Sequence, residues 1–183
     1  MADTFIFIPA YNVEQTLGKV LEDIPESVWR RSAVQVIDDG SRDDTRGAFN
    51  QFMENHPGLP LFYFRFGKNL GYGAVVKKGL KLGLAGSYKY VACLHGDGQY
   101  PANMLDKFID HLENFRTPEG RELALLQGSR CSDPDSAKVG KMPWHKRVGG
   151  AFLTAIENRV FHQKLTDRHS GFNLYRREFL QQL

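Results

Sequence analysis

The chain has 183 residues, of which 42% are hydrophobic and 25% charged, the composition typical of an ordinary soluble globular domain. No apolar run approaches the roughly 18 residues that a membrane-spanning helix needs, and the first run, Phe5 to Ile8, is too short for a signal peptide. The two cysteines, Cys93 and Cys131, have no CxxC spacing, so we expect no disulfide framework, no zinc site and a reducing, cytoplasmic location.

The net charge of +3 is unevenly distributed along the chain. Residues 1–127 contain 14 Lys and Arg against 16 Asp and Glu, whereas residues 128–183 contain 10 against 5. The basic last third is either a solvated face or a surface that meets something anionic, such as a phosphate or an acidic membrane, and both interpretations stay open. We expect no nucleic-acid partner, because no RNP, zinc-finger or helix-turn-helix pattern is present.

Short apolar runs alternate with amphipathic stretches along the chain, which predicts an α/β three-layer sandwich with a mostly parallel central sheet. In chain order we expect strand Thr4–Pro9, helix Glu14–Ile24, strand Val34–Asp38, helix Asp43–Asn55, strand Leu61–Phe66, helix Gly71–Ala85, strand Tyr90–His95, helix Ala102–Asn114, strand Leu123–Ser129, a polar loop Arg130–Pro143, helix Trp144–Phe161, strand Asn173–Arg176 and a helix beginning at Arg177–Leu180. The sequence stops at Leu183, just after this last helix begins, and we therefore expect a single domain that is truncated at its C-terminus. Within the helix Gly71–Ala85, Gly79 and Gly83 share a face and would let the helix approach the sheet closely.

Polar clusters follow four of the predicted strands, and ligands of open α/β sheets bind at the carboxyl ends of the strands. We therefore expect one site built from all four. The clusters are Pro9-Ala10-Tyr11-Asn12, Asp38 to Thr45, His95-Gly96-Asp97-Gly98-Gln99 and Gly128-Ser129-Arg130.

The second cluster begins with two adjacent carboxylates, Asp38 and Asp39. They could accept hydrogen bonds from a base N–H or from ribose hydroxyls, or they could cap the next helix. Ser41 followed by Asp44 resembles a capping box, so we favour capping for Ser41 and Asp43. For Asp39 we favour a ligand role.

The third cluster carries hard oxygen ligands suited to Mg²⁺ or Mn²⁺. Asp97 and Gln99 are alternate residues and would point the same way in an extended segment, although Gly-Asp-Gly is also good β-turn chemistry. His95 is either a ligand or a structural hydrogen bonder. The stretch from Lys68 to Gly73 could form an anion-binding helix start, which is a weak signal.

The basic last third offers candidate phosphate ligands, since guanidinium groups contact phosphate bidentately. Asp167 precedes Ser170-Gly171-Phe172 and is either a cap or a carboxylate that acts as a base or orients an acceptor. The candidate phosphate ligands are Arg130, Lys138, Lys141, Lys146 and Arg147.

These motifs, in this order, resemble the family 2 glycosyltransferases, and within them the dolichyl- or polyprenyl-phosphate sugar synthase branch. The resemblance covers almost the whole chain and rests on the ordered set, because each motif is weak alone. The motifs are the four clusters above, Asn69-Leu70-Gly71, and Asp167 with Ser170-Gly171-Phe172.

The resemblance implies a GT-A fold, with a nucleotide-binding half at about 1–100 and an acceptor half at about 101–183. It also implies a GDP- or UDP-sugar donor, Mg²⁺ or Mn²⁺, inversion at the anomeric carbon, and a polyprenyl-phosphate-type acceptor reached at the cytoplasmic face of a membrane. The implied donor-site residues are Pro9, Tyr11, Asn12, Glu14, Asp38, Asp39, Gly71 and His95. The implied metal ligands are Asp97 and Gln99, and the implied acceptor-side residues are Arg130, Arg147 and Asp167.

The chain departs from the family pattern at three places. Val13 stands where the family often has Glu, and Glu14 comes one residue later; His95 stands at the usual first Asp of the metal motif; and Asn173 replaces a common Arg. No membrane segment follows the domain in this chain, as one often does in the family.

Three other functions stay open beside transfer to a lipid phosphate. One is transfer to a saccharide hydroxyl, which would need a base such as Asp167. Another is a catalytically silent domain that binds nucleotide sugars. A nucleotidyltransferase is less favoured, because Pro9-Ala10-Tyr11-Asn12 replaces the Gly-rich basic loop that such enzymes place after the first strand.

Overall fold

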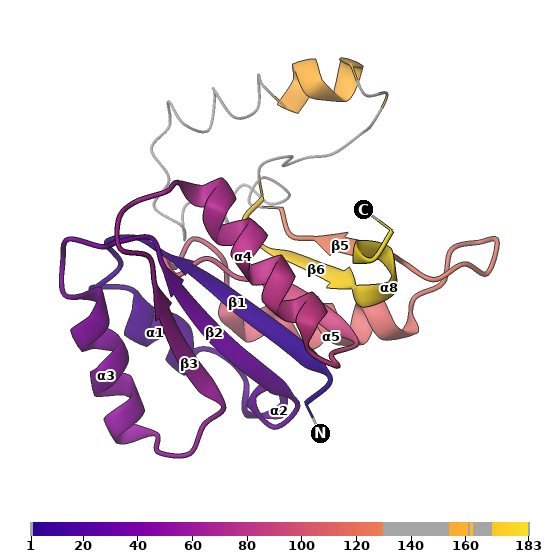
Figure 1. The fold of residues 1–183 in the computed structure, drawn as a ribbon. Helices are drawn as coiled ribbons and strands as arrows, with labels where there is room; N and C mark the ends of the chain where they lie inside the picture. Colours follow the sequence, from indigo (N-terminus) through magenta and orange to yellow (C-terminus); the bar gives the residue numbers. More distant parts are fainter. Residues whose placement is uncertain (1, 130–153, 161, 163–169, 183) are drawn as a thin grey trace.

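A six-stranded sheet lies at the centre of the structure, a computed structural model that describes residues 2–129, 154–160, 162 and 170–182. Figure 1 shows α4 crossing the near face of the sheet and α5 lying behind it, which confirms the three-layer arrangement. The strands are β1 (Thr4–Ala10), β2 (Ser32–Asp38), β3 (Leu61–Arg65), β4 (Tyr90–Cys93), β5 (Leu125–Gln127) and β6 (Asn173–Arg176). The helices are α1 (Leu17–Glu22), α2 (Glu26–Trp29), α3 (Thr45–Asn55), α4 (Tyr72–Ala85), α5 (Leu105–Asn114) and α8 (Arg177–Leu180), with a 3₁₀ turn at Ala102–Met104 and a further helical segment at 154–160.

The strand order is β3-β2-β1-β4-β6-β5. β1 pairs in parallel with β2 and β4, and β2 pairs in parallel with β3, whereas β6 is antiparallel to both β4 and β5. The prediction of a mostly parallel sheet is therefore confirmed. Because β5 runs in the same direction as β1, the carboxyl ends of β1, β2, β4 and β5 lie at one edge of the sheet.

Two hydrophobic layers cover the two faces of the sheet. Along β1 the side chains alternate, so Ile6 and Ile8 face one layer and Phe5 and Phe7 the other. The first layer includes apolar residues of α1, α2, α3 and α5, and the second includes residues of α4 and α8. Burial on both faces explains why β1 and β4 read as nearly continuous apolar runs, and why β2 does so apart from Gln35 at its centre.

The start of α3 differs from the expected capping box. Asp44 is the N-cap, and its carboxylate accepts the N–H of Gly47 at 3.0 Å. Asp43 does hold the first turn, through the N–H and hydroxyl of Thr45. The capping role predicted for Ser41 was wrong, because the helix begins later and the Ser41 hydroxyl is used in the loop that precedes it.

Two other helix predictions also changed. α2 was missed, because four residues are too few to show a helical period. The helix predicted at Trp144–Phe161 is described only over 154–160, and the rest of that range lies outside the described residues.

Two glycines let α4 lie directly on the sheet, as predicted. A Cβ added at Gly79 would lie 2.3 Å from Cγ of Phe7, and one added at Gly83 would lie 2.7 Å from a methyl group of Val91. Such distances are shorter than any ordinary carbon–carbon contact, so a side chain at either position would push the helix away from the sheet.

Gly79→Ala is expected to lower the free energy of unfolding by about 1–3 kcal/mol, because the Phe7 ring is fully buried and has no room to move. Urea titration followed by circular dichroism measures this. Gly73→Ala is the matched control on the same helix, because nothing lies within 4 Å of a Cβ there. It should leave stability unchanged or raise it by up to ~1 kcal/mol. Equal losses in both variants would contradict the close approach of α4.

Candidate functional site

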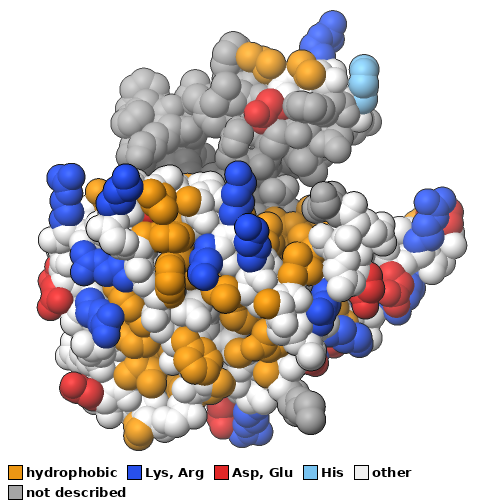
Figure 2. Space-filling view, viewed as in Figure 1, with side chains coloured by type: hydrophobic (Ala, Val, Ile, Leu, Met, Phe, Trp, Pro, Cys, Tyr) orange, Lys and Arg blue, Asp and Glu red, His pale blue; other side chains and the backbone are white. Residues whose placement is uncertain are grey.

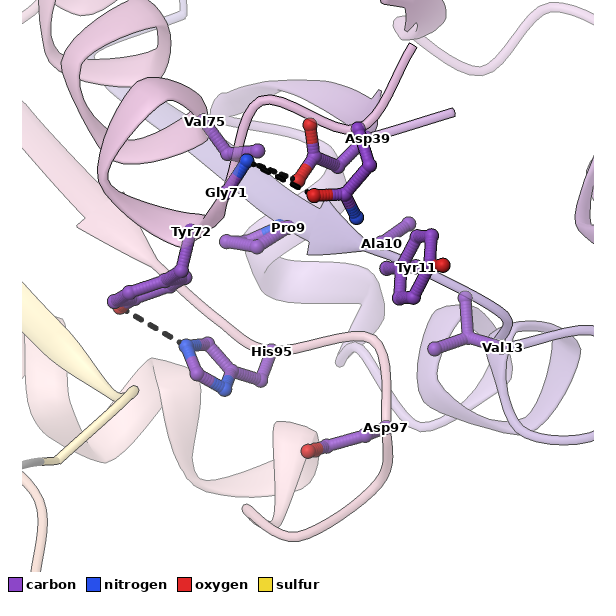
Figure 3. Close-up of a pocket in the computed structure, with 11 residues that line it drawn as sticks. Pro9, Ala10, Tyr11, Val13, Asp39, Gly71, Tyr72, Val75, His95 and Asp97 are labelled. Atoms are coloured by element: carbon purple, nitrogen blue, oxygen red, sulfur yellow. Dashed lines mark hydrogen bonds between the residues drawn. The ribbon is translucent and has the colours of Figure 1, made fainter. Parts of the chain in front are cut away.

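A pocket of about 340 Å³ opens at the carboxyl ends of β1, β2 and β4, beside the first turn of α4. Figure 3 shows its side chains around one space, with Tyr72 and His95 on one side and Tyr11 and Val13 on the other. The lining residues are Pro9, Ala10, Tyr11, Val13, Asp39, Asn69, Gly71, Tyr72, Val75, His95 and Asp97. Three of the four predicted clusters therefore contribute to one pocket.

Asp39 lines the pocket and also fixes the start of α4. Its side chain is almost fully buried, and its two oxygens accept the N–H groups of Leu70 at 2.8 Å and Gly71 at 2.9 Å. Both N–H groups immediately precede the helix, and that of Gly71 is shared with Oδ1 of Asn69 at 3.1 Å. A carboxylate oxygen can accept more than one hydrogen bond, so Asp39 keeps acceptor capacity toward the pocket.

The loops around Asp39 are packed backbone against backbone. Gly40 has φ +74°, and a Cβ there would lie 2.8 Å from the carbonyl carbon of Lys68. Asn12 also adopts a left-handed conformation, with φ 54°, which Asn tolerates better than most residues. Its N–H donates to the Ser41 hydroxyl, and its Oδ1 accepts the N–H of Arg42. Asn12 thus joins the loops after β1 and β2 and is not among the residues that line the pocket.

Asp38 lies behind the pocket, with 1% of its surface exposed. Oδ1 accepts the N–H and hydroxyl of Ser41 at 2.8 and 2.6 Å, and Oδ2 accepts the Tyr63 hydroxyl at 2.7 Å. Arg65 pairs with the same carboxylate at 3.3 Å. Burial, followed by this hydrogen bond to Asp38, raises the pKa of Tyr63 well above its usual range, so its hydroxyl stays a donor. In this arrangement Asp38 acts as a buried anchor, and its contact with a nucleoside stays a prediction.

Of the other donor-site residues predicted near the end of β1, two line the pocket and one lies outside it. Pro9 and Tyr11 line the pocket, and Tyr11 is 42% exposed. Glu14 does not line it, and its Oε2 instead accepts the N–H of Asp44 at 3.1 Å. Glu14 therefore supports the loop before α3.

Asp97 lines the pocket opposite Asp39, as the predicted cation site requires. The expectation of an extended segment was wrong, because Gly96-Asp97 forms a turn and Gly98 follows with φ +72°. Oδ1 of Asp97 accepts the N–H of Gln99 at 3.1 Å, and Gln99 does not line the pocket. The turn thus presents Asp97 to the pocket without Gln99 beside it.

The donor set suits a divalent cation only in part. Within the described ranges, no three His, Cys, Asp or Glu side chains lie close enough together to hold a metal ion. Asp97 is half-buried, and its Oδ2 makes no hydrogen bond in the part of the chain that the structure describes. A cation bound there would need further oxygen ligands, of the kind that a diphosphate supplies.

His95 connects the pocket to the Ser170-Gly171-Phe172 motif. Its Nε2 lies 3.0 Å from the hydroxyl of Tyr72, and its ring meets Tyr72 and Tyr100 edge-on. A Cβ added at Gly171 would lie 2.3 Å from the imidazole ring, and Gly171 donates its N–H to the Tyr100 hydroxyl at 2.7 Å. Both interpretations of His95 keep support, since it lines the pocket and is also hydrogen-bonded.

Tyr72 shields a buried thiol behind this wall of the pocket. Burial raises the pKa of Cys93 to about 12, so the thiol stays protonated and unreactive. Burial, and then the neighbouring Cys93, also raise the pKa of Tyr72 above its usual range. Cys93 is a free cysteine, and Cys131 lies outside the described residues.

Tyr72, Asn69 and Val75 line the pocket although none of them was among the predicted site residues. Asn69 lies in the motif Asn69-Leu70-Gly71, and Tyr72 follows it directly, so the motif was the signal that could have found them. Asn69 Oδ1 also accepts the N–H of Gly71 at 3.1 Å.

The predicted acceptor side lies outside the described residues. Nothing in the structure therefore tests these predictions. The residues concerned are Arg130, Lys138, Lys141, Lys146, Arg147 and Asp167.

The chain is similar to several proteins of known family or structure. It is 24% identical over 181 residues to a dolichyl-phosphate beta-glucosyltransferase of Dictyostelium discoideum, covering 94% of this chain and 54% of that protein. It is 26% identical over 182 residues to a dolichyl-phosphate hexose transferase of Haloferax volcanii, covering 97% and 68%. The chain thus spans about half the length of the first relative and about two thirds of the second.

Among solved structures, the mannosyltransferase PcManGT from Pyrobaculum calidifontis in complex with GDP-Man and Mn²⁺ matches with a TM-score of 0.61. The identity is 17%, and the alignment covers 98% of this chain and 46% of that one. This likeness confirms the expected GT-A fold. The family described as glycosyl transferase family 2 matches residues 5–183, which is nearly the whole chain and includes every motif on which the resemblance rested. The chain therefore belongs to family 2 of the glycosyltransferases.

Proposed function

We propose that this chain transfers a hexose from a nucleotide-diphosphate sugar to a polyprenyl-phosphate-type acceptor, with inversion at the anomeric carbon. The observation that carries the proposal is that Asp39 and Asp97 line one pocket at the carboxyl ends of the strands. Two relatives named as dolichyl-phosphate sugar transferases support the acceptor class. A structural neighbour solved with GDP-Man and Mn²⁺ supports the donor class.

The pocket offers different chemistry to the two ends of such a donor. Asp39, held by the N–H groups of Leu70 and Gly71, can accept from a base or ribose, and the exposed Tyr11 ring gives a surface for stacking. Asp97 lies on the opposite side, where its carboxylate would repel a diphosphate unless a cation lay between them. The nucleoside would therefore lie toward Asp39 and the diphosphate toward Asp97.

We assign Asp97 as the protein ligand that would hold Mg²⁺ or Mn²⁺. Gln99, the second predicted ligand, would reach the cation only with its side chain turned into the pocket, which it does not line in this structure. When bound, the cation would neutralise negative charge on the leaving diphosphate. The turn that presents Asp97 is fixed by its hydrogen bond to the Gln99 N–H, so the carboxylate is already oriented toward the pocket.

The proposed acceptor is already anionic near neutral pH and needs no general base. Arg130 and Arg147 would position its phosphate, and direct attack from the opposite face of the sugar would invert the anomeric carbon. An acceptor hydroxyl would instead need a base, with Asp167 as the first candidate.

A thermal-shift panel of UDP, GDP, CDP and dTDP sugars, each with and without Mn²⁺, tests donor binding. We expect one nucleotide to raise the melting temperature by about 5 °C or more at saturating ligand, because a ligand that binds only the folded state stabilises it. The shift should be larger with Mn²⁺, and the same donor should support transfer to a polyprenyl phosphate. If no nucleotide sugar shifts the transition, the proposal fails. Metal-independent binding without turnover would favour a silent binding domain.

A further inference from the structure

A long segment in the middle of the chain carries positive charge and no negative charge. Residues 55–96 contain no Asp or Glu, and they form β3, α4, β4 and the loops between them. Two parts of the segment line the pocket: the residues at the start of α4, including Asn69 and Gly71, and His95 after β4. Its cationic residues are Arg65, Lys68, Lys77, Lys78, Lys81 and Lys89.

Three of these cations are exposed and make no ion pair within the described residues: Lys68, Lys77 and Lys81. The others are engaged, since Arg65 pairs with Asp38, and Lys78 and Lys89 lie over the rings of Phe64 and Tyr90. Lys77 and Lys81 are one helical turn apart on the side of α4 that faces away from Gly79 and Gly83, which are buried against the sheet.

The face of the molecule that α4 covers shows this charge directly. In Figure 2, Lys and Arg side chains lie mainly across the upper half of the face, among apolar side chains, and Asp and Glu side chains lie mostly at its edges. The neighbouring helix α8 carries Arg177 and Glu178 and adds no net charge. The face is therefore positively charged over the described residues that form it.

Apolar side chains are exposed at the end of α4 that borders the pocket. Leu70 is 48% exposed and Tyr72 is 50% exposed, and Tyr72 lines the pocket. Exposed apolar side chains beside lysines are the pattern of surfaces that lie on an anionic bilayer, with the apolar groups among the headgroups and the cations at the lipid charge. No helix in the described ranges is long and apolar enough to cross a bilayer.

We propose that the α4 face, formed by Lys68, Leu70, Tyr72, Lys77 and Lys81, docks on the surface of an anionic lipid bilayer. This inference deepens the proposed function, because a polyprenyl-phosphate acceptor resides in a membrane and the α4 face borders the pocket. The exposed aliphatic side chain of Leu70 favours a bilayer over nucleic acid, because single-stranded nucleic acid is held by cations and by stacking on aromatic rings, neither of which uses an aliphatic group.

Co-sedimentation of the full chain with lipid vesicles tests the inference. The probes are vesicles of phosphatidylcholine alone and vesicles with about one third phosphatidylglycerol. We expect binding only to the anionic vesicles, weakening as salt is raised. Lys77→Glu with Lys81→Glu should weaken it roughly tenfold or more, since each lysine near the surface contributes. Lys107→Glu with Arg121→Glu changes the net charge equally at exposed sites outside the α4 face and should weaken it much less.

The inference is overturned by equal binding to neutral vesicles, by equal losses in the two double variants, or by tighter binding to single-stranded RNA than to anionic vesicles. The nucleotide-induced thermal shift of Lys77→Glu with Lys81→Glu should equal that of the wild type, because neither lysine lines the pocket. If the protein transfers sugar to a detergent-dispersed polyprenyl phosphate but does not bind vesicles, the docking inference fails and the proposed function stands. Vesicle binding through the α4 face without any transfer would instead refute the proposed function.

Discussion

Asp97→Asn is expected to lower the rate of sugar transfer by about 10²–10³-fold, because charge neutralisation at a leaving diphosphate contributes several kcal/mol to the transition state. Asn keeps the size of Asp and can still accept the N–H of Gln99, so the turn should persist. The lost property is the negative charge that faces the pocket. Transfer of radiolabelled hexose, measured across a range of Mn²⁺ concentrations, gives both the rate and the apparent affinity for the metal.

The control for Asp97→Asn is Asp110→Asn, which removes a carboxylate from the exposed surface of α5. Both variants should unfold within ~1 kcal/mol of the wild type, since neither change leaves a buried group unpaired. The metal assignment fails if Asp97→Asn transfers at the wild-type rate. It also fails if Asp110→Asn loses as much activity, because the effect would then be one of overall charge.

Asp38→Ala is expected to lower the free energy of unfolding by about 3–5 kcal/mol, one of the largest losses that a single substitution in this chain could cause. The substitution leaves the N–H and hydroxyl of Ser41 and the hydroxyl of Tyr63 without their partner. Each buried polar group left unpaired costs about 1–3 kcal/mol. The lost ion pair with Arg65 contributes less to this decrease in stability, because half of the Arg65 side chain is exposed and water can solvate it instead.

Tyr63→Phe is the matched test of this network, because it removes only one of the hydrogen bonds to Asp38. Tyr63→Phe should lower the free energy of unfolding by about 1 kcal/mol. The double variant should lower it by less than the sum of the two single changes. Urea unfolding of all four proteins measures this coupling. If Asp38→Ala unfolds like the wild type and only loses its response to nucleotide sugars, Asp38 is a nucleotide ligand and not an anchor.

The sequence predicted the centre of the sheet well, because β1 and β4 are buried on both faces and stand out as apolar runs. The rule that ligands bind at strand ends also grouped Pro9, Tyr11, Asp39 and Asp97, and all four line one pocket in the structure, although their roles there stay predictions. Family 2 membership and the GT-A fold followed from the order of the motifs rather than from any single one.

The roles within the site were harder to predict, because they depend on contacts between loops that are distant in the sequence. Asp38 and Asp39 are adjacent, yet Asp38 is held by Tyr63, and Asp39 holds the start of α4 at Leu70. Local pattern does not reveal such pairings. The conformation assumed for residues 97–99 was wrong for another reason, since the left-handed Gly98 turns the chain where an extended segment was assumed.

The contact between α4 and the sheet has a consequence for how the molecule would sit on a surface. At Gly79 against Phe7 and Gly83 against Val91, no side chain separates the backbone of α4 from the sheet, so these two contacts hold the helix at a fixed distance. Asp39 fixes the same helix at its first turn. The span from Lys77 and Lys81 to the mouth of the pocket is therefore a rigid dimension, and whatever holds the two lysines also sets the angle at which the mouth meets that surface.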